Sequence, residues 1–258
     1  MFSINHFTKV ALLAISIAVA IPAVSKSQSV KKGIKNIVLV HGAFADGSSW
    51  AKVIPLLQSK GYNVFAVQNP LSSLEDDVEA TKRAIAAMDG EVLLIGHSWA
   101  GVVITEAGND SKVKGLMYVC AFAPDDNQSL TDVAKDFPPA QGNKAVQVSP
   151  SGFLSLTSKG INEDFAQDLP PAERNVIFAT QGEWGAQCTT ARVSTAAWKN
   201  KPSWFIVGTN DHMISPDLER AEAKKMKATT IELKTSHVPM VSQPKKVADF
   251  IMAAAQKL

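Results

Sequence analysis

The chain has 258 residues, of which 46% are hydrophobic and 19% are charged, a composition that suits one large folded domain and argues against disorder. Its formal net charge of +2 falls to zero when the first 27 residues are left out, and a neutral body has no long-range attraction for nucleic acid or an anionic membrane. We therefore expect no nucleic-acid partner and no stable membrane association after processing. Two cysteines are too few for a disulfide scaffold or a cysteine-based zinc site, so we also expect no metal.

Residues 1–27 are predicted to be a secretory signal and the start of a linker. Lys9 precedes an apolar run at residues 10–24, and small residues follow around Ser25. A basic start, a short apolar core and small residues are typical of a signal that is cleaved, here near Ser25. An uncleaved anchor is the alternative, although the run is short for a span of ~20 apolar residues. We therefore expect a secreted or periplasmic protein.

Strand-like and helix-like segments alternate through the rest of the chain. Six short and mostly apolar runs predict strands at residues 37–40, 63–67, 92–95, 115–121, 204–207 and 229–233. Helical patterns occupy residues 49–60, 73–88, 99–108, 217–227 and 244–257. This alternation predicts an α/β fold with a mostly parallel six-stranded sheet and helices on both faces.

One long segment interrupts the alternation. Residues 124–201 contain no clear strand, only helical patches at 162–167 and 171–180. Ligands bind beyond the carboxyl ends of parallel strands, where such an insertion would lie. We interpret it as a small helical lid that divides the core into residues 28–123 and 202–258.

Ser98 is the first candidate catalytic residue. An apolar strand leads into Gly96-His97-Ser98-Trp99-Ala100-Gly101, and a helix follows. A serine on a sharp strand-to-helix turn is exposed as a nucleophile, and the Trp99 N–H then points from the helix N-terminus at a developing oxyanion. The alternative is a serine that only caps the helix.

Two further residues complete the candidate set. Asp211 follows an apolar strand by one short loop, where it can orient a histidine, although it can also merely cap the turn. His237 follows the last strand and has the position of a general base. We interpret His212 as a loop histidine, and His41 and His97 as structural hydrogen-bonding residues. The order Ser98, Asp211, His237 is that of α/β-hydrolases.

Four motifs make the sequence resemble the α/β-hydrolase superfamily over residues 35–258. They are HGAFADGSSW (41–50), GHSWAG (96–101), GTNDHMISP (208–216) and SHVPM (236–240). Taken together, they are similar to the group of plant methylesterases, hydroxynitrile lyases and bacterial carboxylesterases. The resemblance implies a six-stranded core, a small helical cap, no cofactor, and a second oxyanion donor from the Ala43 N–H or the Phe44 N–H.

The resemblance implies a serine hydrolase with a Ser-His-Asp triad. We expect it to cleave a small, mostly apolar or aromatic carboxylic ester through an acyl-enzyme. Alternatives are a lyase or perhydrolase on the same fold, or a ligand-binding protein that retains the fold. Hydroxynitrile lyases carry lysine directly after the histidine, whereas this chain has Val238. The candidate substrate contacts, which are equally compatible with ordinary core packing, are Phe44, Trp99, Phe153, Phe178 and Trp184.

The two cysteines leave a choice open. In an oxidising compartment Cys120 and Cys188 can pair. Cys120 lies in an apolar run and reads equally well as a small core residue, and we favour two free thiols.

Overall fold

A parallel β-sheet forms the centre of the computed structural model, which describes residues 33–258. Its six strands lie in the order β2-β1-β3-β4-β8-β9, and every neighbouring pair is parallel. The predicted six-stranded sheet is therefore confirmed. The strands are β1 (Asn36–Val40), β2 (Asn63–Ala66), β3 (Val92–His97), β4 (Val113–Val119), β8 (Ser203–Gly208) and β9 (Thr229–Leu233).

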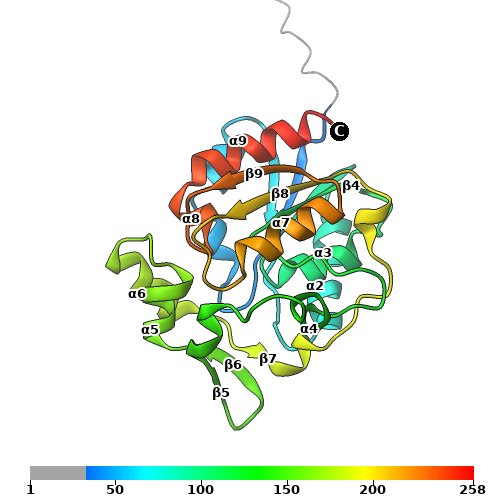
Figure 1. Ribbon diagram of the computed structural model, residues 1–258. Helices are drawn as coiled ribbons and strands as arrows, with labels where there is room; N and C mark the ends of the chain where they lie inside the picture. The colour runs from blue at the N-terminus through cyan, green and yellow to red at the C-terminus, as the bar shows by residue number, and fades with distance from the viewer. Residues whose placement is uncertain (1–32) are drawn as a thin grey trace, which may run out of the picture. The chain divides into compact units, whose positions relative to one another are not determined.

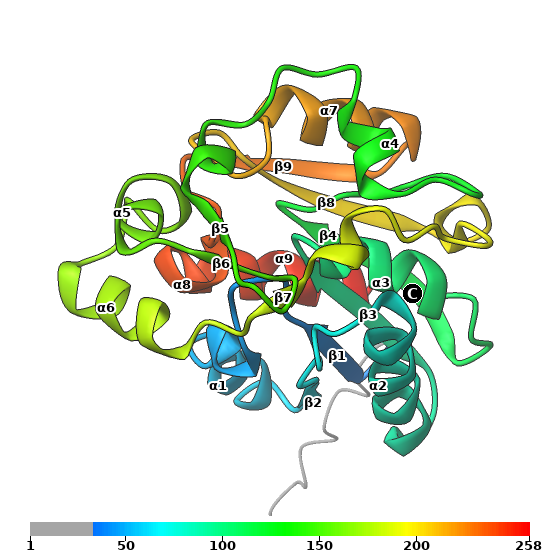
Figure 2. The ribbon, with the colours of Figure 1, turned by 90° about the horizontal axis from the view of Figure 1, so that it is seen from below.

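Burial explains why the central strands are continuously apolar. Every residue of β1, β3 and β8 is buried, because helices cover both faces of the sheet, whereas the edge strands β2 and β9 are partly exposed. Figure 2 shows α1 and α9 on one face, and α2 and α3 on the other. The helices packed on the core are α1 (Ile54–Gln58), α2 (Leu74–Ala87), α3 (Ala100–Ala107), α7 (Pro216–Lys225), α8 (Pro239–Ser242) and α9 (Pro244–Ala255).

Local sequence signals fix several helix ends. The Ser73 side chain caps α2 by accepting a hydrogen bond from the Asp76 N–H, and Pro216 begins α7. The helix expected at residues 49–60 is instead a 3-10 turn (Gly47–Trp50) followed by α1. Asp46 caps that turn through the Ser48 N–H, so the chain turns tightly before α1, which has Pro55 in its first turn.

The insertion, residues 124–201, contains strands as well as helices. Its helices are α4 (Leu130–Ala134), α5 (Ser158–Gly160), a π-helical turn (Ile161–Phe165) and α6 (Pro171–Thr180), together with short 3-10 turns at Gln141–Ala145, Ala186–Thr189 and Ala197–Lys199. The expectation of a small helical lid did not include the antiparallel sheet that the insertion forms from β5 (Val146–Val148), β6 (Phe153–Leu156) and β7 (Trp184–Gly185). These strands are too short to produce a clear alternating pattern. Figure 1 shows them grouped with α5 and α6 beside the core.

Two further sequence-based expectations concern the cysteines and the N-terminal segment. Cys120 and Cys188 are both buried and free, as favoured. The predicted signal, residues 1–27, lies outside the described residues. Within residues 33–258, no helix has the length and hydropathy needed to cross a membrane.

Candidate active site

Ser98 lies on a strained turn between β3 and α3. Its φ of 56° is in the left-handed region, which a non-glycine residue rarely adopts. The turn needs small neighbours, because a Cβ at Gly96 would lie 2.5 Å from the Ala100 carbonyl oxygen and one at Gly101 would lie 2.1 Å from that of Phe122. Ala100, which replaces the second glycine of the motif, fits as a fully buried residue.

His237 joins Ser98 to Asp211. Its Nε2 lies 2.8 Å from Ser98 Oγ, and its Nδ1 lies 2.5 Å from Asp211 Oδ2. The amides of Met213 and Ile214 donate to Asp211 Oδ1 and fix the carboxylate. Ser98 and His237, which are 139 positions apart, and Asp211 thus form one chain of hydrogen bonds at the carboxyl ends of β3, β8 and β9. All three residues are buried, and Ser98 is the most exposed of them at 8%.

The other histidines make structural contacts. His41 Nε2 accepts from the Asn69 N–H, and its Nδ1 lies 2.9 Å from the Gly42 carbonyl oxygen. His97 Nε2 bonds to the carbonyl oxygen of His237, which supports the loop that carries the candidate base. Burial lowers the pKa of both His41 and His97, so both rings are neutral at pH 7. His212 contacts the Glu163 carbonyl oxygen and the Asp164 carboxylate of the insertion, in agreement with its interpretation as a loop histidine.

The predicted oxyanion donors surround Ser98. The backbone after β1 passes so close that a Cβ on Gly42 would lie 2.6 Å from Ser98 Cβ. Ala43 and Phe44 follow, and Phe44 has a positive φ of 58°. Trp99 precedes α3 directly, at the positive end of the helix dipole. Within residues 33–258, neither the Ala43 nor the Trp99 amide donates to a loop, turn or side-chain acceptor, so both are available to a ligand.

A cavity of about 590 Å³ opens onto Ser98 and His237. Its walls are mostly apolar, and three of the five predicted substrate contacts, Phe44, Trp99 and Trp184, line it. The Trp184 ring lies 5.8 Å from that of Phe44 and 5.3 Å from that of Trp99. Other apolar side chains also line the cavity but were not predicted from the sequence as substrate contacts. They include Phe122, Leu130, Ala134, Leu154, Met213 and Ile214.

Phe153 and Phe178 do not line this cavity. Successive residues of a strand face opposite sides, so it is Leu154 of β6 that turns inward, while Phe153 is only partly buried. Phe178 lies on the outer face of α6 and is 42% exposed. The aromatic character of the insertion indicates apolar packing, but it does not reveal which ring faces the cavity.

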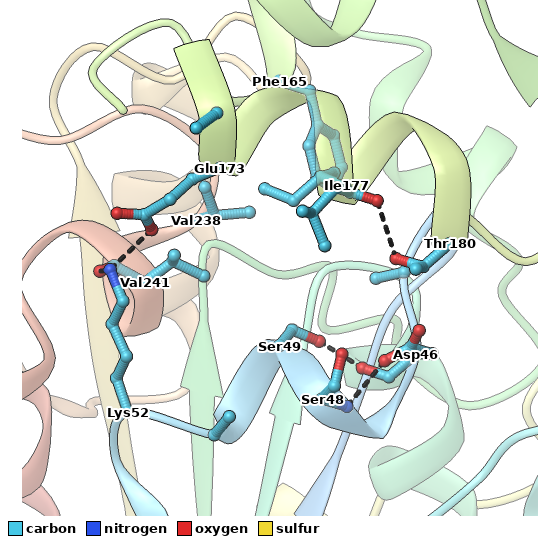
Figure 3. Close-up of a pocket in the computed structure, with 14 residues that line it drawn as sticks. Asp46, Ser48, Ser49, Lys52, Phe165, Glu173, Ile177, Thr180, Val238 and Val241 are labelled. Carbon is cyan, nitrogen blue, oxygen red and sulfur yellow. Dashed lines mark hydrogen bonds and ion pairs between the residues drawn. The ribbon is translucent and has the colours of Figure 1, made fainter. Parts of the chain in front are cut away.

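A second cavity of about 320 Å³ lies between α6 and the 3-10 turn (Figure 3). Ile177 and Phe165 face it from one side, and Ser48 and Ser49 face it from the other. The Phe165 ring packs edge-on against His237, with the ring centroids 5.2 Å apart. This second cavity is lined by neither Ser98 nor His237, so the reacting groups face the larger cavity only.

Two buried carboxyl groups near the site were not anticipated. Asp77 of α2 accepts hydrogen bonds from the Trp99 indole N–H at 2.7 Å and from the Leu71 N–H at 2.7 Å. Burial raises the pKa of Asp77 to about 6. Glu219 of α7 is fully buried and accepts from the Gly208 N–H. An acidic residue inside an amphipathic helix resembles a surface residue in the sequence, so only the packing reveals either one.

One cluster within the described residues has the donor types of a metal site. The side-chain atoms of Cys120, Asp211 and Glu219 lie within 4.8 Å of one another. Asp211 already accepts hydrogen bonds at both oxygens, and Glu219 Oε2 accepts one from the backbone. Burial raises the pKa of Cys120, which opposes the thiolate that a metal would need. The cluster is therefore a set of protein hydrogen-bonding groups.

The sequence matches a known protein family over most of its length. The model of the alpha/beta hydrolase family matches residues 37–250. Methylesterase 2 of Arabidopsis thaliana is 25% identical, over 88% of this chain and 98% of that protein. The pyrethroid hydrolase of Sphingobium wenxiniae is 24% identical, over 84% and 86% respectively. The crystal structure of polyneuridine aldehyde esterase superposes with a TM-score of 0.74 at 22% identity, and it covers 85% of this chain and 98% of that one.

Proposed function

The chain belongs to the alpha/beta hydrolase family, and on that premise we propose that it is a serine hydrolase of small, mostly apolar or aromatic carboxylic esters. The observation that carries the proposal is the chain of hydrogen bonds from Ser98 Oγ through His237 to Asp211, in the wall of an apolar cavity. The names of similar proteins, a methylesterase and a pyrethroid hydrolase among them, support the same class of reaction.

Acylation begins at Ser98. Its Oγ attacks the acyl carbonyl carbon of the ester while His237 Nε2 takes the hydroxyl proton, for which the 2.8 Å separation is suitable. Asp211 holds the ring through Nδ1 and stabilises the imidazolium that forms. His237 then returns the proton to the leaving alcohol, and the acyl group remains on Ser98.

The amides of Ala43 and Trp99 bind the oxyanion in this scheme. Both belong to backbone beside Ser98, one on the loop after β1 and the other at the start of α3. A preorganised donor of this kind is worth ~3 kcal/mol to the transition state. Water, activated by His237 in the same way as Ser98, then cleaves the acyl-enzyme and restores the serine.

The cavity favours an apolar substrate. Phe44, Trp99 and Trp184 form an aromatic wall, and Leu154 and Ile214 add aliphatic surface. Lys135 is the one charged residue among the described lining residues other than the reacting groups. Val238, buried directly after His237, places an apolar side chain where hydroxynitrile lyases carry lysine, which favours ester hydrolysis over lyase chemistry.

The test is a panel of aryl and alkyl esters assayed with the wild type and with Ser98→Ala. We expect saturable turnover by the wild type, and a loss of at least about 10³-fold in kcat for the variant, as when a triad member is removed elsewhere. Ser49→Ala is a suitable control, because this serine lines the second cavity and not the one onto which Ser98 and His237 open. Undiminished turnover by Ser98→Ala would refute the proposal.

A further inference from the structure

Glu219, a buried carboxyl group that this mechanism does not use, lies close to Asp211. Glu219 is on α7, and none of its surface is exposed. Its Oε2 accepts a hydrogen bond from the Gly208 N–H at 2.9 Å, at the end of β8. Within residues 33–258, no donor reaches its other oxygen, Oε1. A buried oxygen without a donor is costly for a carboxylate, but it suits an oxygen that itself carries a proton.

Glu219 and Asp211 are close enough to compete for one charge. Carboxylate oxygens of the two residues lie within 4.8 Å of each other and of Cys120 Sγ, away from water. Two carboxylates at such a distance do not both ionise. Asp211 accepts three hydrogen bonds, including the one from His237, whereas Glu219 accepts one. The carboxyl group that accepts more hydrogen bonds keeps the negative charge. The negative charge therefore lies on Asp211 and the proton on Glu219.

Within residues 33–258, no cation forms an ion pair with Glu219, although the charge of the adjacent Arg220 opposes the rise of its pKa slightly. Cys120, at the end of β4, is neutral because burial raises the pKa of its thiol. Arg220, the next residue of α7, points outward and forms ion pairs with Asp217 and Glu232. His237 lies beyond Asp211 and is bonded to it. Burial, and then the charge of Asp211, raise the pKa of Glu219 well above its usual value.

We propose that Glu219 is a positioning residue that remains protonated and donates its carboxyl hydrogen to the carboxylate of Asp211. This inference rests on the proposed function, because Asp211 orients a catalytic histidine only in that mechanism. The additional hydrogen bond restrains the Asp211 carboxylate further, besides the bonds from Met213, Ile214 and His237. It also draws negative charge away from the Asp211 carboxylate, which weakens the attraction between that carboxylate and an imidazolium at His237.

The first test is the pH dependence of kcat/KM. Glu219→Gln keeps an N–H donor for Asp211 and an acceptor for Gly208, so the acid limb should remain where it is in the wild type. Glu219→Met has a similar volume and no donor, and its acid limb should move to higher pH by about half a unit or more. The control is Glu222→Gln, a buried glutamate one turn along α7 that accepts from the Ala123 N–H, and its limb should not move.

Two kinetic results would overturn the proposal. A shift of the acid limb to lower pH in Glu219→Gln would mean that an ionised Glu219 had been holding the proton on His237. An unmoved limb in Glu219→Met would mean that Glu219 does not act through Asp211.

The second test does not depend on turnover. The infrared difference spectrum of wild type minus Glu219→Gln at neutral pH should contain the C=O stretching band of a protonated carboxyl group. A spectrum with carboxylate bands alone would overturn the proposal. If the wild type hydrolysed no ester, the proposed function would fail, whereas this band would still decide where the proton lies.

Discussion

Replacing Asp77 by Asn should change how the free energy of unfolding depends on pH. Burial raises the pKa of Asp77 from 3.8 to about 6. Between about pH 4 and pH 6 the folded chain therefore keeps a proton that the unfolded chain has lost, and the free energy of unfolding falls as the pH rises through this window. A shift of about two units, each worth ~1.4 kcal/mol, makes the whole decrease on the order of 3 kcal/mol.

The variant Asp77→Asn does not titrate at this position. Its amide has one carbonyl oxygen for two donors, the Trp99 indole and the Leu71 N–H, so we expect it to lose ~1 kcal/mol below the window. As the pH rises through the window, the Asp77 contribution to the free energy of unfolding falls in the wild type, and the variant has no such loss. The difference in free energy of unfolding between the two proteins should therefore shrink and then favour the variant. Urea unfolding followed by tryptophan fluorescence between about pH 4 and pH 8 measures both curves.

The neighbouring residue provides the control. Asp76 is exposed, and hydrogen bonds from Ser72 and Ser73 lower its pKa, so its contribution to stability is lost as the pH falls below about 4. Asp76→Asn should therefore change the pH dependence in the opposite sense, outside the window of Asp77. Parallel curves for the wild type and Asp77→Asn would refute the reasoning.

Three further expectations concern the turn, the cavity and the thiols. Gly96→Ala should lower the free energy of unfolding, measured with urea, by about 1–3 kcal/mol and abolish turnover, because the new Cβ would lie 2.5 Å from the Ala100 carbonyl oxygen. A fully active variant would contradict the geometry of the turn. Trp184→Ala should raise the KM for aryl esters about tenfold, a loss of ~1.4 kcal/mol in binding free energy, because this ring lines the cavity. Phe178 is exposed, so Phe178→Ala should leave the KM unchanged. Equal effects of the two substitutions would contradict the cavity assignment. Cys120 and Cys188 should react with a thiol reagent only after unfolding, because both are buried and burial raises their pKa values; rapid reaction of the native protein would contradict their burial.

The core could be predicted from the sequence because local signals and burial agree there. The continuously apolar runs of β1, β3 and β8 are dictated by cover on both faces, and Ser73 and Pro216 mark helix starts by their own hydrogen-bonding chemistry.

The positions of the three candidate catalytic residues follow from the same parallel sheet. Each comes directly after a strand or within one short loop of it, and parallel strands bring their carboxyl ends to one edge. The order along the chain therefore predicts the meeting of Ser98, Asp211 and His237.

The insertion and the supporting carboxyl groups could not be predicted in this way. Strands as short as β7, with two residues, have no measurable period, so the sheet in the insertion left no pattern. Asp77 and Glu219 are acidic residues in amphipathic helices, where most such residues face water. Their burial depends on which face of the helix meets Trp99 or Asp211, and that is settled by tertiary packing.

The most direct test of the central claim is covalent labelling of the wild type with a fluorophosphonate probe, followed by peptide mass mapping. A serine activated by His237 and Asp211 should be labelled once, at Ser98, and His237→Ala should slow the labelling by about 10²-fold or more. Labelling at another residue, or an equal rate in His237→Ala, would contradict the claim that these three side chains act together.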